Sequence, residues 1–293
     1  MAACLAVNVP QTAAQSTEEL VAPVPAPVPL PLMPTANSFV SNLDLECFAT
    51  PGPALNRVLT LRHLNPVLQS LGLPAHRVIV RELAQTCVPV RKNNAVLPPL
   101  AQLFIRHVDL ACYRVEAEPV ANPPILLLRH LNPMLSHLPR HAVRLLRPQQ
   151  LCLPVGKNNV QPPPAVLNLV RHIDLECYAA QASFHPNFGV TVRQLNPQLT
   201  NVFAHGLQAT SSPRQMCVPV RKNQQTIPGP VLNIVRWIDL EKFPVSPAVN
   251  ILPRRLILNH QNPLLVNTPP VPVVLLQARA LMVPVSKNGA TPP

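Results

Sequence analysis

Six cysteines are spaced so that they can form three disulfide bonds. They make three pairs with a spacing of 40 residues: Cys47 with Cys87, Cys112 with Cys152, and Cys177 with Cys217. In a fourth copy of the pattern both positions change together, to Lys242 and Met282. Six independently buried cysteines would not explain this joint loss. A disulfide does explain it, because once one cysteine of a pair is replaced the remaining thiol has no partner and no reason to be kept. A zinc site would need cysteines about two to four residues apart, and the sequence has none. We therefore predict three disulfides, and Cys4 is left as a free thiol or part of an N-terminal signal.

Four aspartates and four lysines recur at the same repeat spacing and form a second candidate set. They are Asp44, Asp109, Asp174 and Asp239, and Lys92, Lys157, Lys222 and Lys287. Four Asp–Lys pairs could form four ligand sites, or each pair could stabilise a turn at the end of a strand. We favour the structural role, because buried charged groups are usually paired for structural reasons.

No arrangement of catalytic or metal-binding residues recurs through the sequence. His107 and His172 precede the repeated aspartate by two positions, but Asn42 and Trp237 replace them in the other copies. The sequence also lacks a glycine-rich phosphate loop, a nucleophilic serine motif and a His-Glu-x-x-His zinc motif. It therefore predicts a protein that is not an enzyme, with no catalytic residue, no metal ligand and no cofactor.

These residues belong to a unit of 65 residues that occurs four times. The aspartate block lies at 43–48, 108–113, 173–178 and 238–243, and the lysine block at 87–93, 152–158, 217–223 and 282–288. A Leu-Asn-Pro block between them drifts by a residue or two, at 64–66, 131–133 and 195–197, with a Gln-Asn-Pro variant at 261–263. We predict a proline-rich extension at 1–37 and repeats at 38–102, 103–167, 168–232 and 233–293, the last cysteine-free and incomplete.

Each repeat is expected to be a small β-rich unit. Ile173, Leu175 and Cys177 alternate along one block, which is typical of a half-buried strand. The lysine block is interpreted as a strand with an edge proline that ends in a Lys-Asn turn, since asparagine tolerates left-handed backbone angles. Residues 164–171 are expected to form one or two helical turns, and the 40 prolines disfavour long helices. The predicted fold is mainly β: a tandem array of four sandwich- or barrel-like units, three with an internal disulfide.

Charge and cysteine usage limit the partners and the compartment. The formal net charge of +12 suits an acidic polysaccharide or another polyanion, whereas scattered arginines and 3% aromatic residues disfavour nucleic acid. Disulfides require an oxidising compartment, so we expect export to the extracellular space, the cell surface or the periplasm. The N-terminus is a poor signal peptide, because Asn8 and Pro10 interrupt its apolar core. No stretch approaches the ~20 apolar residues of a transmembrane helix.

The two blocks resemble a tandem-repeat domain of unknown function found in exported bacterial proteins. That family shows Leu-Cys-x-Pro-Val-x-Lys-Asn, then a short stretch with proline, then His-x-x-Leu-x-Cys-Tyr. The matching residues here are 151–158 and 172–178, with equivalents in the other copies from about residue 38 onward. The resemblance implies an exported repeat protein and says nothing about activity. This chain departs from the pattern in its N-terminus and in its cysteine-free fourth copy.

We derive one functional hypothesis from the phase of the array and an alternative from its basic charge. It opens on an aspartate block without a complete partner before it and closes on a lysine block without one after it. Our first hypothesis is a secreted structural protein that forms or decorates a fibre, surface layer or shell, by head-to-tail contacts between strand edges with itself or another structural protein. The alternative is a monomeric, surface-displayed binding module for an acidic polysaccharide or another polyanion.

Overall fold

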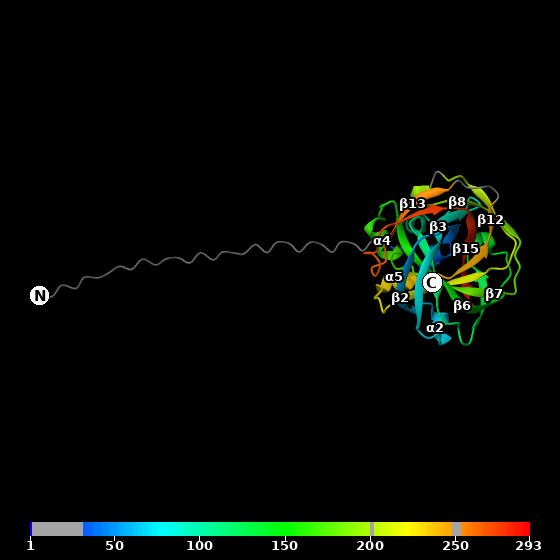
Figure 1. The fold of residues 1–293 in the computed structure, drawn as a ribbon, viewed down its shortest axis with the longest axis horizontal. Coiled ribbons are helices and arrows are strands. Elements are labelled where there is room, and N and C mark those ends of the chain that lie inside the picture. Colours follow the sequence, from blue (N-terminus) through cyan, green and yellow to red (C-terminus); the bar gives the residue numbers. More distant parts are fainter. Residues whose placement is uncertain (2–31, 200–201, 248–252) are drawn as a thin grey trace. The chain divides into compact units, whose positions relative to one another are not determined.

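The computed structural model describes residue 1 and residues 32–199, 202–247 and 253–293. Met33–Pro293 form one compact unit (Figure 1). Most of the predicted proline-rich extension at 1–37 lies outside the described residues, and its end begins helix α1 (Ala36–Val40). The prediction of a mainly β protein is confirmed.

The repeats follow one order of elements: a short helix, a first strand, a second strand, a helical turn and a last strand. The first repeat contains α1, β1 (Asp44–Ala49), β2 (Ala54–His63), α2 (Pro66–Ser70) and β3 (His76–Lys92). The second contains α3 (Pro99–Ile105), β4 (Leu110–Glu116), β5 (Ile125–His130), η1 (Pro133–Leu135) and β6 (His141–Lys157).

In the third and fourth repeats the last strand is interrupted, so that it appears as two strands. The third repeat contains α4 (Pro164–Val170), β7 (Leu175–Ala182), β8 (Phe188–Gln194), η2 (Pro197–Leu199), β9 (His205–Ala209) and β10 (Gln215–Lys222). The fourth contains α5 (Gly229–Val235), β11 (Leu240–Pro244), β12 (Ser246–Pro247), β13 (Arg254–His260), β14 (Val271–Leu275) and β15 (Ala278–Lys287). Helix α4 confirms the helical turns expected at 164–171. Proline occupies the first turn of α3, α4 and α5, where its missing N–H would have no helical partner.

The first and last strands of the repeats form a closed antiparallel barrel. Its order is β1–β3–β4–β6–β7–β10–β11–β15, and β15 pairs again with β1. The four repeats therefore share one barrel within one sheet, and the repeat boundaries divide a single compact unit.

The two ends of the array meet inside the chain. Leu45 in β1 lies opposite Met282 in β15, and the N–H of Asn37 donates to the carbonyl oxygen of Pro293 at 3.0 Å. Closure removes free edges from the barrel wall. The ends that the sequence led us to expect as open are thus paired with each other, and the edges of β1 and β15 are not available for a head-to-tail contact.

Four helices lie together at one end of the barrel. Helix α1 contacts α3 and α5, and α4 contacts the same two helices. Each of the four precedes the start of a first strand. Their apolar residues, among them Phe39, Phe104, Leu169 and Ile234, form one hydrophobic core with the six paired cysteines. This end of the barrel interior is therefore packed.

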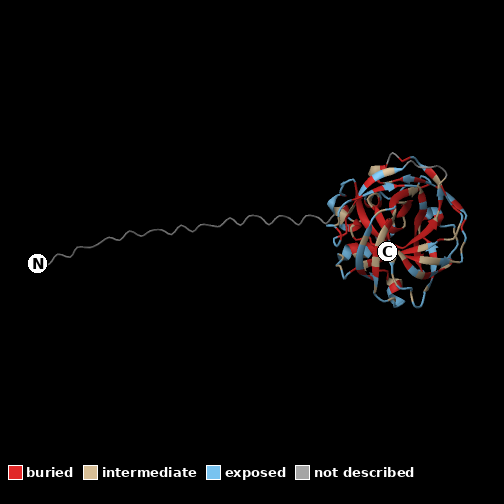
Figure 2. Cartoon of the chain, in the orientation of Figure 1, coloured by how far each residue is buried: buried red, intermediate tan, exposed pale blue. Residues whose placement is uncertain are grey.

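The second strand of each repeat pairs with the last strand of the repeat two positions away: the first repeat with the third, and the second with the fourth. β2 pairs with β10, β5 with β15, β8 with β3, and β13 with β6. Each Lys-Asn turn takes part: Asn93 has a φ of 46° and its side-chain oxygen accepts from the N–H of Thr191 at 2.8 Å, and Asn158, Asn223 and Asn288 make equivalent bonds. The predicted Lys-Asn turn is confirmed. Figure 2 shows the result, with buried residues along the central strands and exposed residues around the outside.

Candidate functional site

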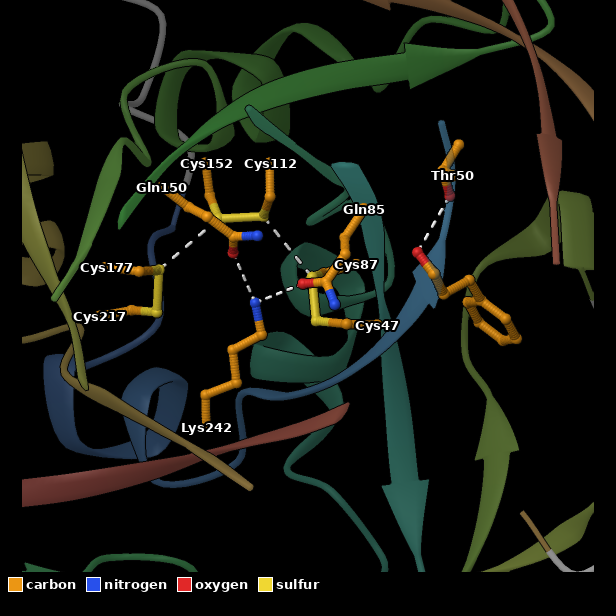
Figure 3. The surroundings of a disulfide bond; sticks show 11 residues. Cys47, Thr50, Gln85, Cys87, Cys112, Gln150, Cys152, Cys177, Cys217 and Lys242 are labelled. Atoms are coloured by element: carbon orange, nitrogen blue, oxygen red, sulfur yellow. Dashed lines mark hydrogen bonds between the residues drawn. A yellow bond between two sulfur atoms is a disulfide. The ribbon is translucent and has the colours of Figure 1, made fainter. Parts of the chain in front are cut away.

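The three predicted disulfides are confirmed, and they lie side by side in the barrel. Each joins residues directly opposite on neighbouring strands: Cys47–Cys87, Cys112–Cys152 and Cys177–Cys217. The Sγ atoms of Cys87 and Cys112 are 3.6 Å apart, and those of Cys152 and Cys177 are 3.7 Å apart (Figure 3). In the fourth repeat Lys242 lies opposite Met282 at the corresponding position.

The repeated aspartates and lysines form four buried ion pairs, one in each repeat. The pairs are Asp44–Lys92, Asp109–Lys157, Asp174–Lys222 and Asp239–Lys287. A third residue, the asparagine of the Leu-Asn-Pro block, comes from the next repeat and donates its side-chain N–H to the aspartate. These bonds are Asn132 to Asp44, Asn196 to Asp109, Asn262 to Asp174 and, closing the ring, Asn65 to Asp239.

The same asparagine also begins the helical turn that follows it. Its side-chain oxygen accepts an N–H two residues on, as in Asn65 to Val67 at 2.9 Å, which satisfies an otherwise unpaired donor of the first turn. Each Asp–Lys–Asn group therefore joins two repeats, and its geometry fits the structural role that we favoured from the sequence.

On the side of the disulfides that is farther from the four helices, the interior of the barrel becomes polar. Side chains two residues apart on a strand face the same side, so Gln85, Gln150 and Gln215 project on the same side as the cysteine that follows each of them. Gln85 lies opposite Ala49, at the end of β1 that is remote from α1. The glutamines thus lie toward the end of the barrel that the four helices leave uncovered.

A cavity of about 670 Å³ occupies this end. Its lining includes Gln85, Gln150, Gln215, Lys242 and the exposed Arg214 and Arg279, and contains no acidic residue. We call this cavity the lysine cup. A second hollow of about 520 Å³ shares Gln149, Gln150 and Gln215 with it and adds Arg114, Arg147 and Glu116.

Lys242 is the buried cation of the lysine cup. Its Nζ donates to Oε1 of Gln85 at 2.5 Å and to Oε1 of Gln150 at 2.7 Å (Figure 3). β11 is not a neighbour of β3 or β6 in the barrel wall, so these bonds cross the interior. Within the described part of the chain no carboxylate pairs with this ammonium group, and burial lowers the pKa of Lys242 from 10.5 to about 7. Ammonium and free amine are therefore both populated near neutral pH.

Two arginines line the same cavity, Arg214 in backbone contact with Lys242 and Arg279 in backbone contact with Val245. The N–H of Arg214 donates to the carbonyl oxygen of Lys242 at 3.0 Å, and the N–H of Val245 donates to that of Arg279 at 3.1 Å. Neither guanidinium forms an ion pair with a described residue. The site therefore offers one buried cation and two exposed cations to an anionic group that enters it.

The sequence did not predict this site. Lys242 was noted only as the replacement of a cysteine, although it is the one lysine outside the four lysine blocks. The sequence also did not predict three buried glutamates on the barrel strands, Glu46, Glu176 and Glu241, which are each paired with a histidine. These glutamates recur two residues after the repeated aspartate, and this spacing was the sequence signal that could have identified them.

No protein family, curated protein or solved structure matches the chain. No helix in the described residues is long and apolar enough to cross a membrane. The resemblance of the repeat blocks to the exported bacterial repeats stays a prediction.

Proposed function

We propose that the chain is an exported, non-enzymatic binding module whose lysine cup accepts an anionic group of an acidic polysaccharide or another polyanion. The observation that carries this proposal is Lys242, a buried cation that faces a cavity and is paired only with neutral glutamine oxygens. A desolvated charge without a counter-ion is costly, and an anion in the cup would relieve that cost.

The energetics of an anion at Lys242 are favourable. A hydrogen bond to a charged group contributes about 1.5–3 kcal/mol, which corresponds to roughly 10- to 100-fold in affinity. An anion would also raise the pKa of Lys242, because an opposite charge favours the ammonium form. Binding is therefore coupled to proton uptake and weakens as the pH rises above about 7.

Two further features support the other parts of the proposal. Three disulfides are typical of an oxidising compartment and hence of export. The lining of the lysine cup has no histidine, carboxylate, serine or thiol beside Lys242 that would serve as a proton donor, acceptor or nucleophile. A role in a fibre, surface layer or shell stays a prediction from the sequence, and the edges of β1 and β15 on which we based it are paired within the chain.

Calorimetric titration with polygalacturonate and dextran sulfate tests the proposal, with neutral dextran as the comparison. The wild type should bind the two polyanions, with affinity that falls as salt increases. Lys242→Met should weaken binding about 10- to 100-fold. The control is Arg193→Gln, which removes an exposed arginine of β8 that lies opposite Arg91, outside the cup. The proposal fails if neither polyanion binds, or if the two variants weaken binding equally.

A further inference from the structure

Three histidine–glutamate pairs lie between the barrel and the outer strands; all three glutamates are buried, as are His141 and His205, and His76 is half-buried. In each, the Nε2 atom of a histidine lies 2.7 Å from a carboxylate oxygen of the repeat two positions away: His205–Glu46, His76–Glu176 and His141–Glu241. The pairs occupy equivalent positions in the repeats, so their surroundings can be compared directly.

In two of these sites a protein group satisfies the second carboxylate oxygen. The hydroxyl of Tyr178 donates to Glu176 at 2.8 Å and lies 3.1 Å from Nε2 of His63. Gln194 donates its side-chain N–H to Glu46 at 2.5 Å. Each of these carboxylates therefore has two side-chain partners.

The third site lacks such a group. His130 occupies the position of His63 and Gln194, but Phe243 replaces the tyrosine and brings no hydroxyl. Nε2 of His130 lies 3.7 Å from the second oxygen of Glu241, too far for a hydrogen bond, and neither atom has a hydrogen-bond partner among the described residues. Both side chains are 0% exposed. Two buried polar atoms thus face each other unpaired, which is costly unless something lies between them.

The atoms present form a recognisable ligand set. Two imidazole nitrogens, from His130 and His141, and one carboxylate oxygen, from Glu241, lie within 4.8 Å of one another. Zn²⁺ binds imidazole nitrogen and carboxylate oxygen at about 2.0–2.2 Å, and three such ligands leave a fourth position for water.

We propose that His130, His141 and Glu241 bind one divalent transition metal ion of the Zn²⁺ class. The ion replaces the proton between His141 and Glu241 and also bonds Nε2 of His130. Since His130 ends β5, His141 begins β6 and Glu241 lies in β11, the ion ties the outer strand β5 and the start of the barrel strand β6, both in the second repeat, to the barrel strand β11 of the fourth. This is a structural site, independent of the lysine cup.

The chain itself supplies the variants for a test. His130→Gln reproduces the residue found at Gln194, and Phe243→Tyr reproduces the hydroxyl found at Tyr178. The matched control is His63→Gln, which makes the same change at the equivalent site where Tyr178 already satisfies the carboxylate.

Because the site is buried, the metal has to be offered during folding. The oxidised full-length protein is unfolded in denaturant with a chelator, then refolded with Zn²⁺ or Co²⁺ and desalted. Metal content is measured by mass spectrometry, the Co²⁺ form by its visible absorption, and stability by thermal unfolding. We expect about one ion per chain and a raised Tm for the wild type and for His63→Gln, and loss of both in His130→Gln and Phe243→Tyr.

Three results would overturn the proposal: a refolded wild type without metal, unchanged metal content in the variants at His130 and Phe243, or loss of the ion in His63→Gln. Should His130→Gln fail to fold, Phe243→Tyr decides alone, since it keeps all three ligands and adds only the competing hydroxyl.

Discussion

The charge of Lys242 is predicted to destabilise the folded protein, and Lys242→Met isolates that effect. Methionine is close to lysine in length and cannot be charged. It would lie opposite Met282 on the neighbouring strand. The substitution removes the buried ammonium group and leaves the glutamines facing the lysine cup, where water can reach them.

The size of the effect follows from the two protonation equilibria. Burial lowers the pKa of Lys242 to about 7 in the folded protein, whereas the unfolded chain has the ordinary value of 10.5. Between these values the unfolded chain binds more protons, so the stability of the wild type rises with pH. Each pH unit contributes about 1.4 kcal/mol, and the interval from pH 7 to 10.5 contributes about 5 kcal/mol.

Lys242→Met should therefore be more stable than the wild type by about 5 kcal/mol at pH 6, where the whole cost is present. The advantage should shrink steadily between pH 7 and pH 10.5, as the wild type loses its buried charge. A loss of the two hydrogen bonds to glutamine adds an offset that does not depend on pH.

Urea denaturation of the oxidised proteins at several pH values measures this difference. Comparing the two proteins cancels the titration of the other groups, and Arg193→Gln serves as the control because its guanidinium is exposed. A difference between wild type and Lys242→Met that stays constant from pH 6 to pH 10 would refute the reasoning, since Lys242 would then titrate normally in the folded protein.

Three further changes test how the repeats are joined. Asn65→Ala should lower the free energy of unfolding by about 2–4 kcal/mol, measured by denaturation, because it removes a helix cap and a donor to the buried Asp239; a loss below 0.5 kcal/mol would contradict this role. A circular permutant that joins the end of the chain to α1 and opens after the exposed Gln161 should keep its three disulfides and its circular dichroism spectrum; an unfolded permutant would argue against closure of the barrel by β15 and β1. The double variant Lys242→Cys, Met282→Cys should form a fourth disulfide, detected by mass spectrometry, and gain about 4 kcal/mol for a loop of this length; free thiols after oxidative folding would contradict the expected pairing.

The features that could be predicted from the sequence are those that repeat. The joint loss of two cysteines identified the disulfides, and the tolerance of asparagine for positive φ identified the turns at Asn93 and its equivalents. Both inferences needed only spacing and local backbone chemistry, and four copies of each pattern made the spacing visible.

What the sequence did not predict depends on contacts between repeats. His141 and Glu241 are 100 residues apart in the sequence, and they meet because the outer strands of one repeat lie over the repeat two positions along. Closure of the barrel by β15 and β1 has the same character. A repeat examined alone predicts a separate small unit, since nothing within 65 residues shows which neighbour supplies the missing strand.

The two ligand-binding sites that we propose lie at positions where the repeats differ. At Lys242 the other repeats have a cysteine that forms a disulfide, and at Phe243 the third repeat has a tyrosine that satisfies its glutamate. The same backbone therefore accepts residues that would leave no unpaired group at either place. The fourth repeat instead has an ammonium group without a counter-ion and, next to it in sequence, a phenylalanine that leaves two polar atoms unpaired. Both costs disappear when a ligand supplies the missing partner, an anion in one case and a metal ion in the other, and this is the physical reason for placing binding at these two positions and structural roles at the repeated ones.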